Sequence, residues 1–412
     1  MRKKRRVVVT GLGVIAPNGI GKEEFWRSIS RGITGIKNFN ALKSSVKAAG
    51  EIQDYNPDNY FSQEEQDKLT RFSQFSIIVA KEALEDAGLD IKKVNPSRIG
   101  VSLGTTTGGL EFMLDQFPFF INNELEKIHP FTFSKTIPSA ATGILSIYLG
   151  ITGPSKTFCS ACAASTDAIG WGFDSIKRGS LDIAICGGSE TPLHPFVLET
   201  CYKGRILSEG ANRHFNKFPK PFDKRRDGTV VGEGAGILLL EELGSALKRK
   251  APIYAEVVGY ATTSDAHHMV RPLLTGEEAK RAILEALEES KLSRGEVDYI
   301  NAHGTGTVKN DKVETEVIKK AFGNYAYKIP ISSTKAMTGH TFGAAGAIES
   351  IICVLAIKED LVPPTVNYEI PDPECDLDYV PNKPRRKKIN VALCQSFGFG
   401  GENSVLVFRK YR

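Results

Sequence analysis

Short apolar segments rich in β-branched residues alternate with amphipathic helical patterns along almost the whole chain. We expect strands at 5–10, 98–103, 181–186, 235–240, 253–259, 297–301, 329–333, 391–395 and 404–409. We expect helices at 22–31, 70–87, 163–178, 276–290, 311–321 and 344–358. Strands that interleave with helices in this way indicate an α/β fold with a largely parallel or mixed sheet.

The length of the chain limits how that fold is divided. At roughly 150 residues per domain, 412 residues allow two or three units, or one large fused core. The basic run 248–250 and Pro252 interrupt the pattern between two expected strands. We therefore predict a division into residues 1–250 and 251–412, although the two halves show no repeat in their sequences.

Charge and cysteine usage exclude several classes of protein. The net charge of +5 equals the five basic residues at 2–6, so the rest of the chain is balanced and nucleic acid is not expected as a partner. No apolar run approaches the roughly 18 residues of a membrane helix, and the N-terminus lacks the cleavage pattern of a signal peptide. The seven scattered cysteines favour a reducing, cytoplasmic compartment over a disulfide framework.

The segment G-L-G-V-I-A at 11–16 resembles the dinucleotide-binding fingerprint, which must open a helix. Pro17-Asn18-Gly19 follows at once, so we interpret 7–16 as a buried strand and turn, and a nucleotide-dependent oxidoreductase is only a remote alternative. We find no P-loop, no cysteine or histidine pair with metal-ligand spacing and no G-x-S-x-G elbow.

Cys162 is the strongest candidate nucleophile. It lies in A-C-A-A-S at 161–165, at the start of the expected helix 163–178. The free N–H groups and the dipole of a helix N-terminus favour a thiolate, and the N–H of Cys162 offers an oxyanion donor. A lone cysteine among alanines is usually a small packing residue, so its role depends on its partners.

His303 and His340 are the candidate partners of that sulfur. His303 lies in N-A-H-G-T-G-T, where Thr305 and Thr307 add hydroxyls, and His340 follows Gly339 at a Gly/Ala-rich helix start. A position at the mouth of a helix keeps an imidazole neutral and able to donate. The trio combines one reactive atom with two hydrogen-bond donors or proton carriers.

Two further features surround these candidates. Lys335 and Glu349 lie in apolar surroundings, and we expect them to pair because either charge is costly when buried alone. The segment 398–401, G-F-G-G, predicts a loop that closes on the site. In it, Phe399 is a mobile apolar lid whose N–H supplies a second oxyanion donor.

The chain resembles the elongating, type II β-ketoacyl-acyl-carrier-protein synthases of the thiolase-like condensing enzymes. The matching motifs run nearly end to end and include A-C-A-A-S, P-F-D-K-R-R-D-G-T-V-V-G-E-G-A-G, N-A-H-G-T-G-T, S-S-T-K-A-M-T-G-H-T-F-G-A-A-G-A and S-F-G-F-G-G-E-N. The resemblance implies a five-layered αβαβα fold made from two similar halves, a homodimer, and a decarboxylating condensation without a metal or bound cofactor. The phosphopantetheine then arrives on the acyl carrier protein.

The resemblance also implies roles for single residues. Cys162 takes the acyl chain, and His303 and His340 stabilise the enolate formed from the malonyl thioester. The N–H groups of Cys162 and Phe399 form the oxyanion hole, and Phe399 is also the gate. Lys335 belongs to the catalytic group. The remaining implied residues support the site or contact the pantetheine arm: Glu349 and Asp311, and Thr305 and Thr307.

Three departures from the family pattern stand out. V-K-N-D at 308–311 replaces the usual proline, which predicts a looser loop behind His303. Thr107 stands where elongating enzymes often place an apolar side chain that lines the acyl pocket. Acidic neighbours at 64–67 dilute one cluster of the basic residues expected to dock the carrier protein, which are Lys68, Arg71, Arg205 and Arg271.

We therefore expect an acyltransferase that elongates fatty acids from malonyl and acyl thioesters, without membrane insertion. One alternative is a ketosynthase of a dedicated polyketide, polyene or unusual-lipid pathway. A less favoured one is a non-catalytic partner subunit that sets chain length, against which the intact Cys162, His303, His340 and Lys335 argue.

Overall fold

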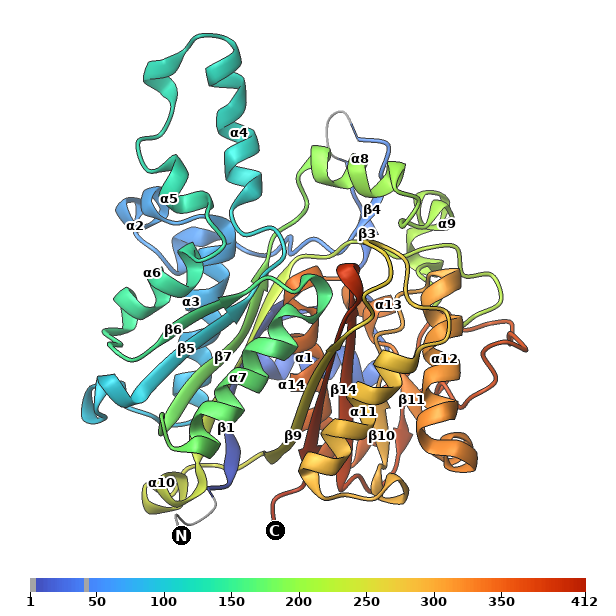
Figure 1. The fold of residues 1–412 in the computed structure, drawn as a ribbon. Helices are drawn as coiled ribbons and strands as arrows, with labels where there is room; N and C mark the ends of the chain where they lie inside the picture. Colours follow the sequence, from blue (N-terminus) through green and yellow to red (C-terminus); the bar gives the residue numbers. More distant parts are fainter. Residues whose placement is uncertain (1–4, 41–43) are drawn as a thin grey trace.

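The computed structural model describes residues 5–40 and 44–412 (Figure 1). Residues 2–4 of the basic N-terminal run lie outside these ranges. The core is one large mixed β-sheet with the strand order β11-β10-β14-β15-β9-β1-β8-β7-β5-β6. Within the described ranges, none of the helices combines the length and the apolarity needed to cross a bilayer.

Each half of the chain supplies five strands of this order. The first half contributes β1 (Val7–Ala16), β5 (Ile99–Gly104), β6 (Ser155–Phe158), β7 (Ile183–Glu190) and β8 (Gly234–Glu242). The second contributes β9 (Ala255–Ser264), β10 (Tyr299–Asn301), β11 (Ile331–Ser332), β14 (Val391–Gly398) and β15 (Glu402–Arg409). The short strand β2 (Gly19–Ile20) pairs with β1, and two small ribbons lie apart: β3 (Lys37–Asn38) with β4 (Ala48–Ala49), and β12 (Leu361–Val362) with β13 (Arg385–Arg386).

The two sets of five strands have the same topology. Counted along the chain, both lie in the spatial order third, second, fourth, fifth, first. In both, the second strand is parallel to the third and fourth, and the fifth is antiparallel to the fourth and first. The halves join where β1 pairs with the start of β9. We therefore propose that the chain divides into 1–250 and 251–412, two copies of one fold.

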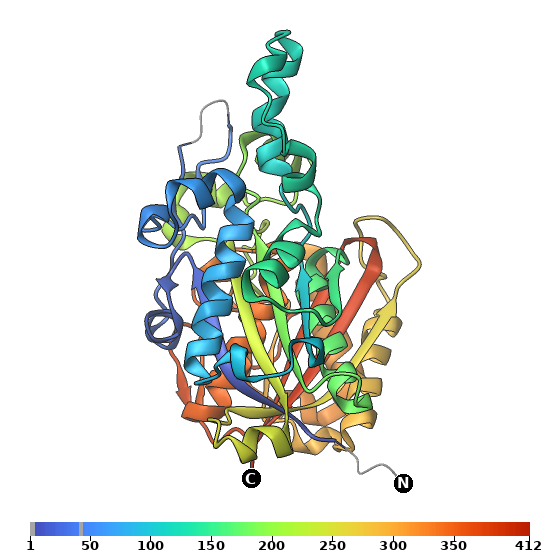
Figure 2. The ribbon, with the colours of Figure 1, turned by 90° about the vertical axis from the view of Figure 1, so that its left-hand side faces the viewer.

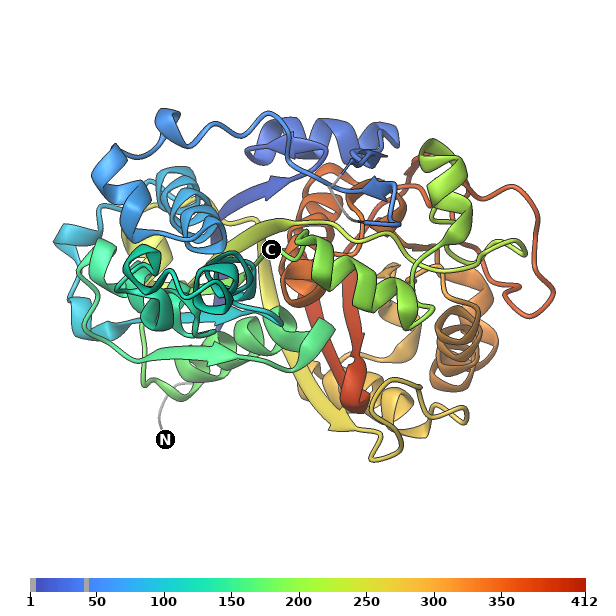
Figure 3. The ribbon, with the colours of Figure 1, turned by 90° about the horizontal axis from the view of Figure 1, so that it is seen from above.

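Helices cover both faces of each half-sheet. They are α1 (Lys22–Arg31), α2 (Gln63–Lys68), α3 (Arg71–Asp86), α4 (Leu110–Ile121), α5 (Thr132–Thr136), α6 (Ala140–Leu149), α7 (Ala164–Arg178), α8 (Pro195–Lys203), α9 (Glu209–Arg213), α10 (Leu243–Lys248), α11 (Glu277–Ser290), α12 (Val308–Phe322), α13 (Lys335–Thr338) and α14 (Ala345–Glu359). In Figures 1 and 3, α7 and α14 lie between the two half-sheets. On the outside, α3 packs on β1 and β8, and α11 packs on β9 and β15.

This arrangement confirms the thiolase-like five-layered αβαβα fold. Helix α14 of the central layer is enclosed by sheet on both faces: every residue from Ala345 to Ile357 is buried. Each strand and helix expected from the sequence is present. The segment 11–16 continues β1, and α1 begins only at Lys22, so no helix follows the glycines.

The pattern analysis missed the helices between β5 and β6. Of these, α4 and α5 project from the body at the upper left of Figure 1 and stand above it in Figure 2. None of the residues of α4 is buried, although Phe117, Phe120 and Ile121 are large and apolar. Only Glu111, Asp115 and Gln116 of this helix are polar, so its amphipathic period is weak, and Pro118 further weakens the pattern.

Candidate active site

Cys162 lies on a tight turn between β6 and α7. A 3₁₀ turn, Ala161–Ala163, leads into α7, and Ala161 has a left-handed backbone with φ of 47°. The predicted position at a helix N-terminus is confirmed. The glycine loop at the end of β14 lies directly beside this turn: a Cβ on Gly398 would lie 3.2 Å from the Cys162 nitrogen. Only a glycine lets the two backbones approach so closely.

The surroundings of the Cys162 sulfur are drier than the sequence suggested. Burial raises the pKa of the Cys162 thiol to about 12, although Lys335 and the N–H of Phe399 act in the opposite direction. The expectation that this position favours a thiolate is therefore wrong for the free enzyme, because the loss of hydration outweighs the effects of Lys335 and the Phe399 N–H. Burial therefore favours the neutral thiol at this sulfur.

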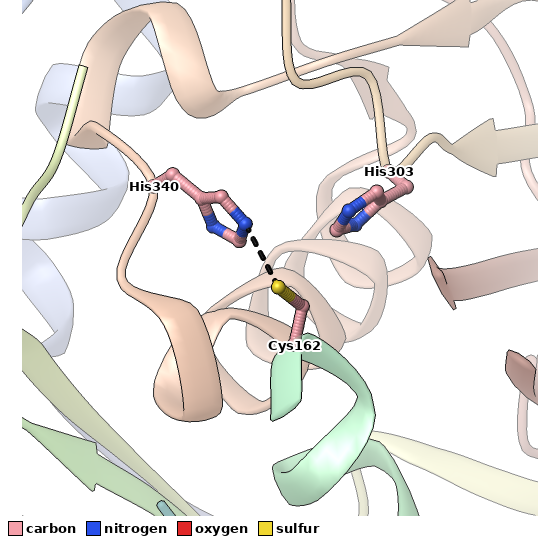
Figure 4. Close-up of side chains that lie close together, drawn as sticks. All are labelled: Cys162, His303 and His340. Atoms are coloured by element: carbon pink, nitrogen blue, oxygen red, sulfur yellow. Dashed lines mark hydrogen bonds between the residues drawn. The ribbon is translucent and has the colours of Figure 1, made fainter. Parts of the chain in front are cut away.

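His303 and His340 converge on this sulfur from the second half of the chain (Figure 4). His340 follows α13 and places Nε2 3.1 Å from the Cys162 Sγ. His303 follows β10, and the centroids of the two rings lie 5.3 Å apart, edge to face. One nitrogen of each ring and the Sγ all lie within 4.8 Å of one another. The three residues that the sequence singled out thus form one cluster.

Both imidazoles are held in their neutral form. Burial and the nearby Lys335 lower the pKa of His303 and of His340 well below the usual value of 6.5, and His340 itself adds to the effect on His303. The sequence predicted a neutral His340 for another reason, a helix mouth; desolvation and a neighbouring cation are the causes here. A neutral imidazole keeps one N–H to donate.

Lys335, the cation beside the two imidazoles, belongs to a buried ion pair. Lys335, the first residue of α13, donates from Nζ to Glu349 Oε1 on α14, and both side chains are buried. This confirms the predicted pairing. Burial raises the pKa of Glu349 to about 7, and Lys335 lowers it in part.

Two carboxylates of α12 hold the loop that carries His303. Glu314 accepts the N–H groups of His303 and Gly304, each at 2.7 Å. Asp311 accepts the N–H of Gly306 at 3.2 Å, and burial raises the pKa of its carboxyl to about 6. The expected looser loop is wrong, because α12 begins directly at Val308 and brings both acids to the loop. Sequence reasoning missed Glu314, whose only signal is its place one turn after Asp311.

A cavity of about 520 Å³ opens onto the cluster. Its lining includes Cys162, His303, His340, Thr305, Thr307 and Phe399. The hydroxyls of Thr305 and Thr307 lie 2.9 Å apart, and the ring of Phe399 is 41% exposed at the mouth. The cavity therefore joins solvent to the sulfur through a passage with hydroxyls on its wall.

Comparisons with known proteins identify this arrangement. Residues 4–246 match the family model "Beta-ketoacyl synthase, N-terminal domain", and residues 254–369 match "Beta-ketoacyl synthase, C-terminal domain". The chain belongs to the β-ketoacyl synthase family. It is therefore an enzyme of the acyltransferase class, a condensing ketosynthase.

Relatives of this β-ketoacyl synthase match it from end to end. A Synechocystis sp. protein named "3-oxoacyl-[acyl-carrier-protein] synthase 2" is 44% identical, with 100% of this chain and 99% of the relative covered. Two solved structures are also similar over their full lengths. "The ishigamide ketosynthase/chain length factor" has a TM-score of 0.93 at 32% identity. The structure described as "type II PKS acyl-carrier protein in complex with its ketosynthase bound to the hexaketide" has a TM-score of 0.91 at 36% identity.

Thr107 of the synthase belongs to a polar cluster beside the cavity. Its N–H donates to Glu190 Oε1 at 2.9 Å, and its hydroxyl reaches the same oxygen. Glu190 is fully buried and also accepts the N–H of Gly343 at 2.9 Å. In the part of the chain described here, Thr107 is not among the residues that line the cavity.

The four basic residues expected to dock a carrier differ in their surroundings. Arg205 and Arg271 are exposed and line the cavity. Lys68 is exposed and pairs with Glu64 along α2, a weak surface contact. Arg71 is half-buried and binds both oxygens of the buried Glu233. The guanidinium of Arg71 is thus already neutralised, which argues against its predicted docking role.

Proposed function

We propose that this enzyme elongates acyl chains by a decarboxylating Claisen condensation. An acyl thioester loads Cys162, and malonyl-acyl-carrier protein supplies two carbons. The products are β-ketoacyl-carrier protein, carbon dioxide and free carrier, in fatty acid elongation. The observation that carries the proposal is the cluster of one thiol and two neutral imidazoles within 4.8 Å at the base of a cavity. The reaction needs no metal or bound cofactor, since the phosphopantetheine comes with the carrier.

In the first half-reaction, the Cys162 sulfur attacks the carbonyl carbon of the acyl thioester. The N–H groups of Cys162 and Phe399 stabilise the oxyanion, and loss of one such donor typically costs about 10²–10³ in rate. The carbon–sulfur bond to the carrier then breaks. The carrier leaves as a thiol with the proton that Cys162 gives up, and His340 Nε2, 3.1 Å from the sulfur, is within reach to relay it.

In the second half-reaction, His303 and His340 donate to the thioester oxygen of the malonyl group. Carbon dioxide leaves, and the electron pair of the broken bond forms an enolate that these N–H groups stabilise. The enolate carbon attacks the acyl carbonyl, the bond to Cys162 breaks, and the released sulfur takes a proton from solvent to restore the thiol. Lys335 contributes by lowering the pKa of both histidines, so that each neutral ring keeps one N–H to donate. Thr305 and Thr307 bind the pantetheine arm, and Glu349 and Asp311 support the site.

Intact-mass spectrometry tests this function. Wild-type enzyme is offered acyl carriers of several chain lengths, and we expect a mass gain of one acyl group that Cys162→Ala abolishes. Addition of malonyl-carrier protein then removes the adduct and yields the β-ketoacyl product. If no acyl carrier of any length modifies Cys162, the proposal is wrong.

Thr107 favours a second candidate within the same chemistry, a ketosynthase for polyketide, polyene or unusual-lipid chains. It places a polar side chain, hydrogen-bonded to Glu190, where family members often have an apolar one, and we propose that Thr107 borders the acyl pocket. We expect the wild type to load short or oxygenated acyl groups, and Thr107→Ile to prefer longer saturated ones. The same adduct measurement, run with both enzymes, reports the preference. A profile unchanged by the substitution would remove Thr107 from the acyl pocket.

We propose that the acyl carrier protein docks at the mouth of the cavity, on Arg205, Arg271 and Lys309. All three are exposed there, and no ion pair neutralises them in the described ranges. Lys309 is in the first turn of α12, where the helix dipole opposes a cation by about 0.3–1 kcal/mol. Attraction between Lys309 and an acidic carrier with its phosphodiester would offset this unfavourable effect, which explains a lysine at the start of α12.

Charge reversal tests this docking surface. In Arg271→Glu with Lys309→Glu, we expect the KM for carrier-bound substrates to rise about tenfold, with a weaker dependence on salt. Small pantetheine thioesters, which lack the carrier, should react as with the wild type. Lys320→Glu, at the far end of the same helix, is the matched control. Equal effects of the two changes on carrier substrates would contradict the assignment.

We further propose a homodimer. Large apolar side chains stand exposed on the projecting helices and the residues beside them: Phe117 53%, Phe120 57%, Ile121 64%, Leu125 55%, Phe131 59% and Phe133 76%. Strand β6, on which α6 packs, is the edge strand of the sheet in the described ranges, with one side free to pair. A surface this apolar is typical of a protein interface.

The seven cysteines are all free thiols, which supports the proposed cytoplasmic location.

Light scattering tests the homodimer. The wild type should have twice the mass of one chain, and Phe120→Glu with Phe133→Glu should reduce it to one. Leu247→Glu, on the exposed side of α10, places the same charge away from these helices and should leave the mass unchanged. A wild-type mass of one chain at micromolar concentration would disprove the dimer.

A further inference from the structure

Asp167, on the first turn of α7, is a buried carboxylate that the reaction described above does not use. Its side chain is 6% exposed, and its hydrogen bonds within the described chain come from hydroxyl groups rather than from a cation. Burial raises the pKa of this carboxyl, and those hydroxyls lower it in part. A carboxylate in such surroundings is costly and points to a specific task.

The first partner of Asp167 belongs to the nucleophile turn. Ser160 donates from its hydroxyl to Asp167 Oδ2. Ser160 stands two residues before Cys162, and its carbonyl accepts the N–H of Ala163 at 3.0 Å. The carboxylate therefore ties the start of the turn to the helix that follows it.

The turn that carries Cys162 is strained and needs contacts that stabilise it. Ala161, between Ser160 and Cys162, has a φ of 47°, a left-handed conformation that is strained for an L-residue with a side chain. If the tie were released, the turn would relax toward an ordinary conformation. The Cys162 sulfur and N–H would then move relative to His340 and the oxyanion position.

The second partner anchors Asp167 to the other half of the molecule. Tyr260, on β9, donates from its hydroxyl to Asp167 Oδ1 at 3.0 Å. Its ring lies directly on α7 at Gly170, where a Cβ would come within 2.3 Å of it. The N–H of Tyr260 donates to Glu289 at 2.9 Å, so the ring is fixed from its backbone as well.

We propose that Asp167 is a positioning residue for the nucleophile. Through Ser160 it holds the strained turn at Ala161, so that the Cys162 sulfur faces the two histidines and the Cys162 N–H faces the oxyanion. Tyr260 fixes the carboxylate from the second half of the chain. The inference rests on the proposed function only in taking Cys162 as the nucleophile.

The rate at which iodoacetamide alkylates Cys162, followed by peptide mass spectrometry, tests this role. We expect Asp167→Ala and Ser160→Ala each to slow alkylation and acyl loading about tenfold, because small displacements of a reacting atom have large effects. Asp167→Asn keeps an acceptor for Ser160 and should recover part of the rate. Asp174→Asn, farther along α7, is the matched control and should react like the wild type.

Malonyl decarboxylation is the second readout. A general structural defect would lower decarboxylation together with alkylation, whereas a positioning role should lower only alkylation. Decarboxylation depends on His303 and His340, and we expect it to stay within about twofold of wild type in both variants. Unchanged alkylation with a lower melting temperature would overturn the proposal, as would equal losses of alkylation and decarboxylation. Ser160→Ala decides the matter if Asp167→Ala fails to fold. Alkylation needs no carrier, so the result stands even if no acyl carrier loads the wild type.

Discussion

Cys162→Ala is expected to abolish condensation while decarboxylation of malonyl-carrier protein continues. The substitution removes the sulfur that holds the acyl chain, so the condensation rate should fall by at least about 10³-fold. The two neutral imidazoles remain, because burial and Lys335 set their pKa values and Cys162 does not. Release of carbon dioxide and formation of the β-ketoacyl product, measured in the same sample, separate the two activities.

The Cys162→Ala variant needs a control that removes a thiol near the same turn. Cys159→Ala deletes a second thiol three residues away, which is exposed and outside the cavity lining of the described chain, and it should leave both activities in place. Equal loss of condensation and decarboxylation in Cys162→Ala would contradict the division of labour between sulfur and imidazoles.

His303→Ala and His340→Ala are each expected to stop decarboxylation. Each removes one of two donors to the developing enolate oxygen, and such a loss typically costs about 10²–10³ in rate. The effects on acyl loading should differ, because His340 Nε2 lies 3.1 Å from the Cys162 sulfur and His303 has no such contact. We expect His340→Ala to slow loading and His303→Ala to leave it near the wild-type rate.

Stopped-flow measurement of acyl transfer, beside the carbon dioxide assay, distinguishes these effects. Phe342→Leu serves as a control for packing, since this ring lies edge to face against His340 and carries no proton to transfer. If loading failed equally in both histidine variants, the imidazoles would be general bases for the nucleophile rather than donors to the enolate.

The sequence predicted the fold where residue patterns carry a period. Each expected strand and helix of the sheet layers is present, because apolar side chains repeat with the spacing that burial demands. Helix α4 was missed because none of its residues is buried and it is apolar over most of its surface, which leaves no distinct apolar stripe to detect. The similarity of the halves was implied by the family resemblance but not by the residue pattern, since it depends on which strands pair and not on which residues form them.

At the site, the residues with distinctive neighbours could be predicted, and those that act through backbone contacts could not. Cys162, His303 and His340 each lie in a glycine- or alanine-rich motif. Glu314 is one acid among 48 acidic residues, and only the structure reveals that it accepts the His303 N–H. The state of the thiol was mispredicted for a related reason: a helix N-terminus is visible in a sequence, whereas the dryness around a sulfur is not.

The duplicated topology sets the stoichiometry of acylation. The turn that carries Cys162 before α7 has a counterpart in the second half, where Phe342, with φ of 40°, and Gly343 precede α14. Gly343 thus matches Cys162, but a Cβ there would lie 2.5 Å from the Thr106 nitrogen and 2.6 Å from a Glu190 oxygen. No side chain fits, so the second copy of the turn is sterically barred from bearing a thiol. We accordingly expect each polypeptide to hold a single growing chain at a time.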